Sequence, residues 1–464
     1  MTSPHRSLVI LGAGGDLAAR LLLPGVGQLL ASDRDTALQL IGVGVEPMTE
    51  EDWRARVAES FSAGGAAGPR VDAVLGATSY LQADVTAADD LRAVLAACEG
   101  APALYFALPP AVTIAVCDAL HDVELPEGTV LALEKPFGTD LATARELNRR
   151  VTALLPENQV HRVDHFLGKS TVLNLLGLRF ANRIFEPVWG AEHIESVEIV
   201  FDERLGLEGR AGYYDRAGAL VDMVQSHLLL VLALIAIEPP SSLEPDDLRG
   251  ALAQALRATR PWKGDAAASS RRARYTGGEI DGRDFPSYAD EPGVDPARGT
   301  ETLAEMTVAI DNWRWAGVPF TLRSGKAMSA TRKEIIITFK PVPHLPFGFA
   351  GEARREQLRI SLSPDELQLD ININGEGDPF SLDRVTLGAD FATGELGAYG
   401  EVLDGILSCD PTLSVRGDAV EECWRIVGPV LAAWAAGEVP LEEYAAGTAG
   451  PESWSSPRGR GRPE

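Results

Sequence analysis

Leu8-Val-Ile-Leu-Gly-Ala-Gly-Gly-Asp-Leu-Ala18 joins a short apolar strand to a glycine-rich turn and the first residues of a helix. In 17–30 the apolar residues recur at helical spacing, and Leu38-Gln-Leu-Ile-Gly-Val-Gly44 has the composition of a second buried strand. A strand, a helix and a strand in this order predict a βαβ unit. The chain is therefore expected to open with an α/β domain.

Two further apolar stretches, 103–107 and 129–133, continue the alternation of strands and helices. This alternation is typical of a parallel, doubly wound sheet. We therefore expect residues 1–170 to form a Rossmann-like dinucleotide-binding domain.

The pattern changes after about residue 170, where polar and apolar residues alternate in 194–201, 334–340 and 357–362. A period of two is typical of strands with one face on a core and one in water. We expect 171–454 to form a larger α+β domain with an antiparallel sheet. The polar segment 262–283 should be a loop, and the tail 455–464 should have no fixed structure.

Composition and charge exclude several classes of partner. The 464 residues are 45% hydrophobic, and the formal net charge is −25 at pH 7. This length exceeds one ordinary core, so the chain should form two domains. The negative charge repels nucleic acid and anionic membranes, so neither is an expected partner.

The sequence predicts a cytoplasmic protein without a metal site. The N-terminus continues into the first strand without an apolar signal segment, and the apolar run 228–237 is too short to cross a bilayer. That run predicts a buried helix. The cysteines show no metal-ligand spacing and indicate reduced thiols; they are Cys98, Cys117, Cys409 and Cys423.

The turn after the first strand is the predicted cofactor site. Small residues there let the backbone approach a pyrophosphate, and the helix N-terminus favours its negative charge. The third glycine of G-x-G-x-x-G is missing, so a plain tight turn is the alternative. The candidate cofactor residues are Gly12, Gly14, Gly15, Asp16 and Leu17.

The end of the second strand, Gly44-Val-Glu-Pro47, should decide which cofactor is bound. It holds no Arg or Lys to meet a 2′-phosphate. Glu46 can instead accept hydrogen bonds from a free ribose diol, which favours NAD over NADP. The alternative is that Glu46 only begins a solvated loop.

Arg162-Val-Asp-His-Phe-Leu-Gly-Lys169 brings a carboxylate, an imidazole and an ammonium close together in sequence. Asp164 can accept hydrogen bonds from sugar hydroxyls, and His165 and Lys169 can donate to an anion. In isolation such a pattern is more typical of a solvated helix face. Together with the motifs 134–138 and 222–227, it favours a sugar phosphate as ligand.

Asp222 and His227 stand just before the apolar run. Five residues of an α-helix turn through roughly 500°, which leaves these side chains about 140° apart, so a direct hydrogen bond requires a non-helical turn. With that bond the carboxylate would fix the imidazole tautomer, and a neutral histidine suits removal of a hydroxyl proton as hydride leaves the same carbon. His227 is therefore the predicted general base, and a satisfied core histidine is the alternative.

Over nearly its whole length the chain resembles the glucose-6-phosphate dehydrogenase family, as a divergent bacterial-type member. The order and spacing of the matching motifs fit the family. These motifs are Gly15-Asp-Leu-Ala18, Glu134-Lys-Pro-Phe-Gly138, Arg162 to Lys169, Leu178-Arg-Phe-Ala-Asn182, Glu208-Gly-Arg210, Tyr213-Tyr-Asp215, Asp222 to His227, Glu238-Pro-Pro240, Asp311 to Pro319 and Leu322-Arg-Ser-Gly-Lys326.

The resemblance implies a role for each matching site residue. His227 would be the catalytic base, and Asp222 would orient it beside the substrate. His165 and Lys169 would bind the substrate phosphate. The residues implied to contact the sugar are Lys135, which also lies in the cofactor set, Asp164, Glu203 and Lys326.

The resemblance also implies a reaction and partners. Glucose 6-phosphate would be oxidised to 6-phosphogluconolactone in the pentose phosphate pathway, with hydride passing to NADP or NAD and no metal required. The antiparallel sheet would mediate a homodimer or higher homo-oligomer. A related sugar or amino-sugar phosphate is an alternative substrate, and a non-catalytic binding subunit is an alternative function.

Several residues depart from the family pattern. Gly14 replaces a Ser or Thr, and Val45 replaces a basic residue, so with Glu46 these changes favour NAD. Phe166 replaces a Tyr, which removes a hydroxyl donor to the phosphate at a cost of about 1 kcal/mol. Leu21 lies where the family's first helix has a cation, and Arg332 and Lys333 are the suggested replacements.

Overall fold

The computed structural model describes residues 6–34, 37–375, 377–391 and 394–455. The chain divides into two compact units. Unit 1 comprises residues 1–170, 240–253 and 394–422, and unit 2 comprises the remainder. The sequence-based division assigned 240–253 and 394–422 to the second domain, whereas both pack with the first unit. The predicted tail, 455–464, lies outside the described residues except for Ser455.

Unit 1 is built on a seven-stranded sheet in the order β18-β6-β5-β4-β1-β2-β3, counted over the described residues. All neighbouring pairs are parallel except β18 with β6. This is the predicted doubly wound sheet. Its strands are β1 (Arg6–Leu11), β2 (Leu38–Gly44), β3 (Ser79–Gln82), β4 (Ala101–Phe106), β5 (Val130–Leu133), β6 (Val160–Val163) and β18 (Ser414–Val415).

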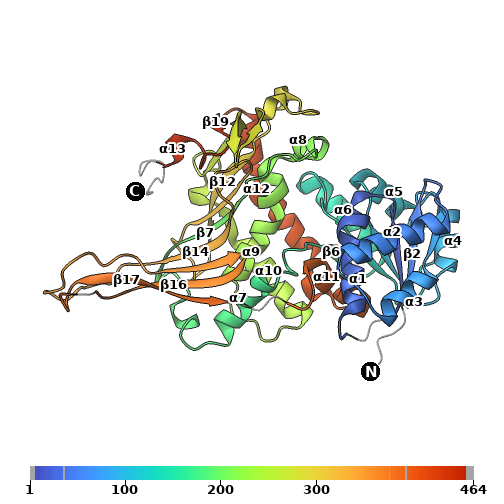
Figure 1. Cartoon of the computed structure of the whole chain (residues 1–464), viewed down its shortest axis with the longest axis horizontal. Coiled ribbons are helices and arrows are strands. Elements are labelled where there is room, and N and C mark those ends of the chain that lie inside the picture. Colours follow the sequence, from blue (N-terminus) through green and yellow to red (C-terminus); the bar gives the residue numbers. More distant parts are fainter. Residues whose placement is uncertain (1–5, 35–36, 376, 392–393, 456–464) are drawn as a thin grey trace. The chain divides into compact units, whose positions relative to one another are not determined.

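The helices of unit 1 form two groups around this sheet; in Figure 1 those from the first third of the chain are blue to teal, and α11 is red. Contacts link η1, α1, α2, α3 and α11 in one group, and α4, α5 and α6 in the other. The helix predicted over 17–30 is present as a short π-helix continued by α1. The helices are η1 (Ala18–Leu22), α1 (Leu23–Ala31), α2 (Glu50–Ala63), α3 (Pro69–Ala77), α4 (Ala88–Ala96), α5 (Pro110–Leu120), α6 (Leu141–Leu154), η2 (Glu157–Gln159), α11 (Ala398–Ser408) and η8 (Pro411–Leu413).

Helix α11 joins unit 1 because its apolar side chains complete the core of that unit. Val402, Leu403 and Ile406 are almost fully buried against residues of α1 and the sheet. Burial of such side chains contributes roughly 1.5–3 kcal/mol each. This packing explains why a segment so late in the sequence belongs to the dinucleotide-binding unit.

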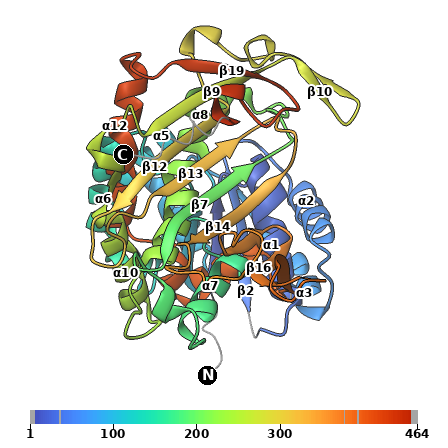
Figure 2. The ribbon, with the colours of Figure 1, turned by 90° about the vertical axis from the view of Figure 1, so that its left-hand side faces the viewer.

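Unit 2 is built on a ten-stranded sheet in the order β17-β16-β15-β14-β7-β13-β12-β9-β19, with β8 beside β12, counted over the described residues. Most pairs are antiparallel, as predicted, but β7 with β13 and β9 with β19 are parallel. Figure 2 shows β9, β12, β13, β7 and β14 side by side. The strands are β7 (Ile194–Asp202), β8 (Thr259–Pro261), β9 (Ser270–Thr276), β12 (Leu303–Ile310), β13 (Phe320–Gly325), β14 (Arg332–Phe339), β15 (Gln357–Leu362), β16 (Asp365–Asn374), β17 (Leu382–Asp390) and β19 (Leu441–Ala445).

The other elements of unit 2 are a small hairpin and several helices. The hairpin pairs β10 (Gly278–Ile280) with β11 (Arg283–Phe285). Helices α10 and α12 include the unit boundaries. The helical elements are α7 (Ser170–Phe180), η3 (Glu186–Val188), α8 (Ala211–Ala219), η4 (Leu220–Leu228), α9 (Leu229–Ala236), α10 (Pro245–Ala258), η5 (Trp262–Gly264), η6 (Tyr288–Asp290), η7 (Pro296–Arg298), α12 (Gly417–Ala435) and α13 (Glu452–Ser455).

The predicted buried helix at 228–237 is present as α9, but it ends a longer helical stretch, 211–236. Within the described residues this is the one helix that is long and apolar enough to cross a membrane by composition. Its most apolar window is 83% buried inside the protein. We therefore assign it to the core of unit 2, where η4 contacts β12 and β13.

The prediction of a loop over 262–283 is wrong, because β9 lies in the main sheet. Its three arginines gave the segment a loop-like composition, yet Ser270, Ala273 and Tyr275 are buried. Arg272 donates to the backbone carbonyls of Trp434 and Val439. Long arginine side chains can thus lie on neighbouring elements while the strand itself remains in the sheet.

Candidate active site

The glycine turn is held tightly between the strands of unit 1. Gly12 has φ +87°, and a Cβ at this position would lie 2.4 Å from the carbonyl oxygen of Ala107. The amides of Gly12 and Ala13 both donate to the carbonyl of Val43, at 2.9 and 3.0 Å. The turn then leads directly into η1, with Gly14, Gly15, Asp16 and Leu17 before its first residue. This close backbone approach fits the pyrophosphate of a dinucleotide.

Glu46 follows β2 and extends to the glycine turn. Its Oε2 atom lies 3.6 Å from the position of a Cβ built on Gly14. The hydroxyl of Tyr80 donates to the Glu46 carbonyl at 2.9 Å, and Arg56 donates to the carbonyls of Gly14 and Gly15 at 2.7 and 3.1 Å. Burial, then the charge of Glu46, raises the pKa of Tyr80. A carboxylate therefore lies beside the turn, together with an arginine that the local sequence did not indicate.

The predicted substrate residues Asp164, His165 and Lys169 follow β6 in unit 1. Asp164 is 1% exposed, and its Oδ1 accepts the amide of Phe166 at 3.0 Å. The ammonium of Lys169 lies 4.4 Å from the ring centroid of Phe166. Phe166 thus provides an aromatic face for this cation.

His165 contacts a cluster that begins at Glu134, the residue before Lys135. The ring of Tyr399, from α11, stacks on the His165 ring with centroids 5.5 Å apart and an interplanar angle of 15°. Tyr399 and Tyr105 both hydrogen-bond to the Glu134 carboxyl. Burial raises the pKa of Glu134 to about 7, although these hydrogen bonds oppose the shift. The cluster thus places the ring of Tyr399 against the His165 imidazole.

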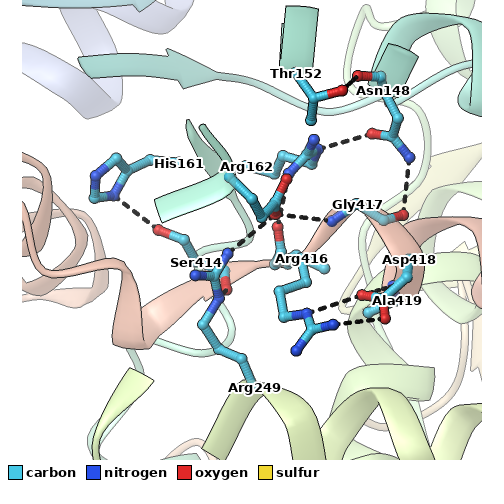
Figure 3. A network of polar contacts seen from close by, with 12 residues as sticks. Asn148, Thr152, His161, Arg162, Arg249, Ser414, Arg416, Gly417, Asp418 and Ala419 are labelled. Carbon is cyan, nitrogen blue, oxygen red and sulfur yellow. Dashed lines mark hydrogen bonds and ion pairs between the residues drawn. The ribbon is translucent and has the colours of Figure 1, made fainter. Parts of the chain in front are cut away.

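A second polar network anchors the strand that leads into Asp164 and His165 (Figure 3). One oxygen of Glu157 accepts from Arg162, Arg249 and the Gly417 amide, at 2.7, 3.2 and 3.0 Å. Arg162 also donates to Asn148 at 3.0 Å. The network therefore connects four segments, namely α6, residues 157–162, α10 and the start of α12, and it includes the strand that precedes Asp164.

This network also borders a pocket of about 390 Å³. The pocket is lined by residues of the network, such as Glu157 and Arg162, and not by the predicted site residues. We interpret it as a gap between structural side chains, because its arginines are matched by carboxylates such as Asp418 and Glu421. We therefore do not assign a ligand to this pocket, and the candidate site lies among the predicted residues themselves.

In unit 2, strand register brings Glu203 and Lys326 together. Strands β7 and β13 are parallel, and their last residues, Asp202 and Gly325, lie opposite each other. The residues that follow the two strands, Glu203 and Lys326, are therefore neighbours. The Lys326 ammonium contacts Glu203 Oε2 at 2.9 Å, and Lys333 contacts Oε1 at 3.3 Å. These two lysines hold the pKa of Glu203 below its usual value, although burial opposes the shift. Glu203 is therefore a carboxylate acceptor beside two cations.

Asp222 and His227 lie on η4, which is a π-helix and not an α-helix. Hydrogen bonds in a π-helix join residues five apart, so such residues share one face. An α-helix, as assumed from the sequence, would place the two side chains about 140° apart. On the π-helix they share a face, so the predicted non-helical turn is not needed. Tyr213 also hydrogen-bonds to Asp222; partial burial and the carboxylate raise its pKa. His227 is 4% exposed.

Comparison with known proteins now decides the family. Residues 9–174 match the family model "Glucose-6-phosphate dehydrogenase, NAD binding domain". Residues 176–458 match the family model "Glucose-6-phosphate dehydrogenase, C-terminal domain". The chain belongs to the glucose-6-phosphate dehydrogenase family. The resemblance inferred from the motifs is thereby confirmed.

Individual relatives of this dehydrogenase family cover almost the whole chain. Glucose-6-phosphate 1-dehydrogenase of Treponema pallidum is 38% identical, over 97% of this chain and 93% of the relative. A crystal structure of the Mycobacterium avium enzyme is 34% identical, with TM-score 0.85 over 97% of this chain and 96% of that one. A structure of glucose-6-phosphate dehydrogenase in complex with glucose-6-phosphate is 28% identical, with TM-score 0.88 over 98% and 97%.

Sequence reasoning missed several residues that contact the dehydrogenase motifs. Arg56 reaches the glycine turn from α2, and Tyr399 reaches His165 from α11. Glu134 lies within the motif 134–138, and its sequence context did not indicate a role. Lys333, in contrast, was suggested from the sequence as a replacement cation, and its ammonium contacts Glu203.

Proposed function

We propose that the chain oxidises glucose 6-phosphate at C1 to 6-phosphogluconolactone and passes hydride to a nicotinamide dinucleotide. The observation that carries this proposal is the full-length family match together with retention of His227, Asp222, Lys326 and Lys169. The family shown is one of NAD(P)-dependent oxidoreductases acting on a CH–OH group, and the reaction belongs to the pentose phosphate pathway.

Residues of unit 1 would bind the anionic parts of both ligands. His165 and Lys169 would bind the substrate phosphate, with the His165 ring fixed by Tyr399. Lys135 and Asp164 would contact the sugar from the ends of β5 and β6. The turn at Gly12, Gly14 and Gly15, with Asp16 and Leu17, would hold the dinucleotide pyrophosphate.

Residues of unit 2 would carry out the proton transfer. His227 would take the proton from the C1 hydroxyl oxygen as the C1–H bond breaks. Asp222 would stabilise the imidazolium from the same face of the π-helix. Glu203 and Lys326 would bind sugar hydroxyls, the carboxylate as acceptor and the ammonium as donor. The nicotinamide ring, when bound, supplies the hydride acceptor.

The proposed cofactor preference is NAD over NADP. Glu46 lies beside Gly14, where its carboxylate can accept from a ribose diol and would repel a 2′-phosphate. Arg56 is the opposing feature, because it is a cation at the same turn. Its hydrogen bonds to the carbonyls of Gly14 and Gly15 direct it to the protein backbone.

We also propose a homodimer in the cytoplasm. Strand β17 is an edge of the large sheet, and apolar side chains near it are exposed. Edges and patches of this kind favour pairing with a second copy. All four cysteines are free of disulfides, which suits a reducing compartment. The exposed apolar residues are Phe347, Ile373, Phe380 and Leu387.

Replacement of the proposed base tests the function directly. In His227→Asn, kcat with glucose 6-phosphate should fall by about 10²-fold or more, while substrate binding is retained. His193→Asn is the matched control, because His193 is exposed in the same unit. Initial rates with several hexose and amino-sugar phosphates, each with NAD and NADP, identify the substrate. Unchanged turnover in His227→Asn would exclude the assigned base, and absence of turnover in the wild type would favour a binding subunit.

A further inference from the structure

The π-helix that carries Asp222 and His227 begins at a break in the chain. Gly218 has φ +66° and separates α8 from η4. The amide of Ala219 donates to the Glu301 carbonyl at 3.3 Å, and the amide of Leu220 donates to Glu301 Oε1 at 3.0 Å. A Cβ built on Gly218 would lie 2.3 Å from the same oxygen. One glutamate therefore caps the first residues of the helix through both its backbone and its side chain.

The carboxyl of Glu301 is buried, and the residue is 6% exposed. Titratable groups that interact with it are Arg272 of β9, Tyr214 of α8 and Tyr288 of η6. Burial raises its pKa to about 7, although the hydrogen bonds from the helix amides oppose the shift. A buried carboxyl is costly without hydrogen-bond partners, and here the partners are the N-terminal amides of the π-helix.

The residues on either side of Glu301 attach the same short segment to other parts of the site. Thr300 donates to the carbonyl of Asp215 in α8 at 2.7 Å. The carbonyl of Thr302 accepts the amide of Lys326 at 2.9 Å. The tripeptide 300–302 is therefore hydrogen-bonded both to the start of the His227 helix and to the residue that contacts Glu203.

We propose that Glu301 is a positioning residue for catalysis, whose side-chain oxygen sets the start of the π-helix and thereby the orientation of the His227 imidazole. It contacts neither substrate nor cofactor in this role, and it acts through the helix. The proposal rests on the assignment of His227 as the base. An amide oxygen at the same place can accept the Leu220 N–H equally well, so Gln should replace Glu, whereas Ala or Asp should not.

The test compares Glu301→Gln, Glu301→Ala and Glu301→Asp with the wild type in the full-length enzyme. Displacement of a catalytic group by about 1 Å costs up to about 100-fold in rate, so kcat of the Ala variant should fall by about 10- to 100-fold. Its KM for glucose 6-phosphate should change by less than about threefold. The acidic limb of its kcat–pH profile should move, because the His227 imidazole no longer has its wild-type orientation. The Asp variant keeps the charge but shortens the side chain, so it should show the same changes if the Ala variant does not fold.

Glu291→Gln is the matched control, because Glu291 accepts from Tyr275 in the same unit without contacting the helix. Support requires losses of kcat in the Ala and Asp variants, a shifted acidic limb, and kcat of the Gln variant within about threefold of wild type. A lower melting temperature with unchanged kcat and pH profile would overturn the proposal, since a purely structural cap would behave in that way. Loss of kcat in the Gln variant would also overturn it. If the wild type lacks activity with hexose phosphates, the proposed function fails instead.

Discussion

The two units position their predicted site residues by different means. In unit 1 these residues lie in short contiguous motifs at the ends of parallel strands, such as Gly12–Leu17 after β1 and Asp164–Lys169 after β6. In unit 2 they come from segments far apart in sequence and meet through strand register, as Glu203 and Lys326 do after β7 and β13. Side chains of the first kind can be recognised from sequence spacing, whereas contacts of the second kind require the fold.

The strongest test of this difference is removal of a residue that only register brings into place. Lys326→Met should lower kcat/KM for glucose 6-phosphate by about 10- to 100-fold, because hydrogen bonds to charged groups are worth about 1.5–3 kcal/mol. Lys340→Met is the control, since the Lys340 ammonium donates to the backbone carbonyl of Ala191 in the same unit. Steady-state kinetics measure both variants. Equal, small effects would show that the contact between Lys326 and Glu203 is structural.

The strands that were predicted well from the sequence are those whose buried side chains are apolar. The bounds predicted for 38–44 and 357–362 agree with β2 and β15. Strand β6 was not predicted, because His161 and Arg162 are polar and yet 0% and 1% exposed. Burial lowers the pKa of His161 to about 3, so its ring stays neutral beside Ser414. A strand that buries polar groups in a network has no apolar pattern to detect.

The second test concerns Tyr399, which reaches the unit 1 motif from a remote segment. Tyr399→Ala removes the ring that stacks on His165, and aromatic pairs are worth about 0.5–1.5 kcal/mol, so KM for glucose 6-phosphate should rise by about 2- to 10-fold. Tyr399→Phe keeps the ring and loses only the hydrogen bond to Glu134, so its KM should rise less. Identical KM values in the Phe and Ala variants would show that the stacking does not orient His165.

Site residues could be predicted from the sequence where the residue type and its motif together indicate a chemical role. His227 and Lys169 are examples, whereas Glu301 and Arg56 had no such signal. Glu301 acts on backbone amides that become available only at a helix start, and Arg56 lies on the turn side of α2. The spacing of Asp222 and His227 was misjudged for a related reason, because sequence periodicity did not distinguish a π-helix from an α-helix.

The third test addresses the cofactor end of unit 1. The wild type should show higher kcat/KM with NAD than with NADP. Glu46→Gln should raise kcat/KM with NADP by about 2- to 5-fold, because exposed charge pairs are worth about 0.2–1 kcal/mol, and should change the value with NAD less. Glu50→Gln, at the exposed start of α2, is the control. A wild type that strongly prefers NADP would assign the 2′-phosphate to a cation such as Arg56.

The smallest expected effect compares one buried carboxyl in each unit. Burial raises the pKa of both Glu134 and Glu301 to about 7, from an ordinary value of 4.5. A carboxyl with a raised pKa favours the folded state when protonated, and this contribution is lost as pH rises through the folded pKa. Each group should therefore lower the stability of its unit as the pH rises from about 4.5 to about 7.

Replacement with Gln removes the titration and keeps a polar side chain of similar size. Relative to wild type, Glu134→Gln and Glu301→Gln should each gain thermal stability as the pH rises from about 4.5 to about 7, by a few degrees in Tm. Because two units can melt separately, calorimetry should resolve which transition moves. If both variants move the same transition, the units unfold as one cooperative body. If neither gains stability at the higher pH, the carboxyls ionise at ordinary values, and their hydrogen bonds to Tyr105 and to the Leu220 amide outweigh burial.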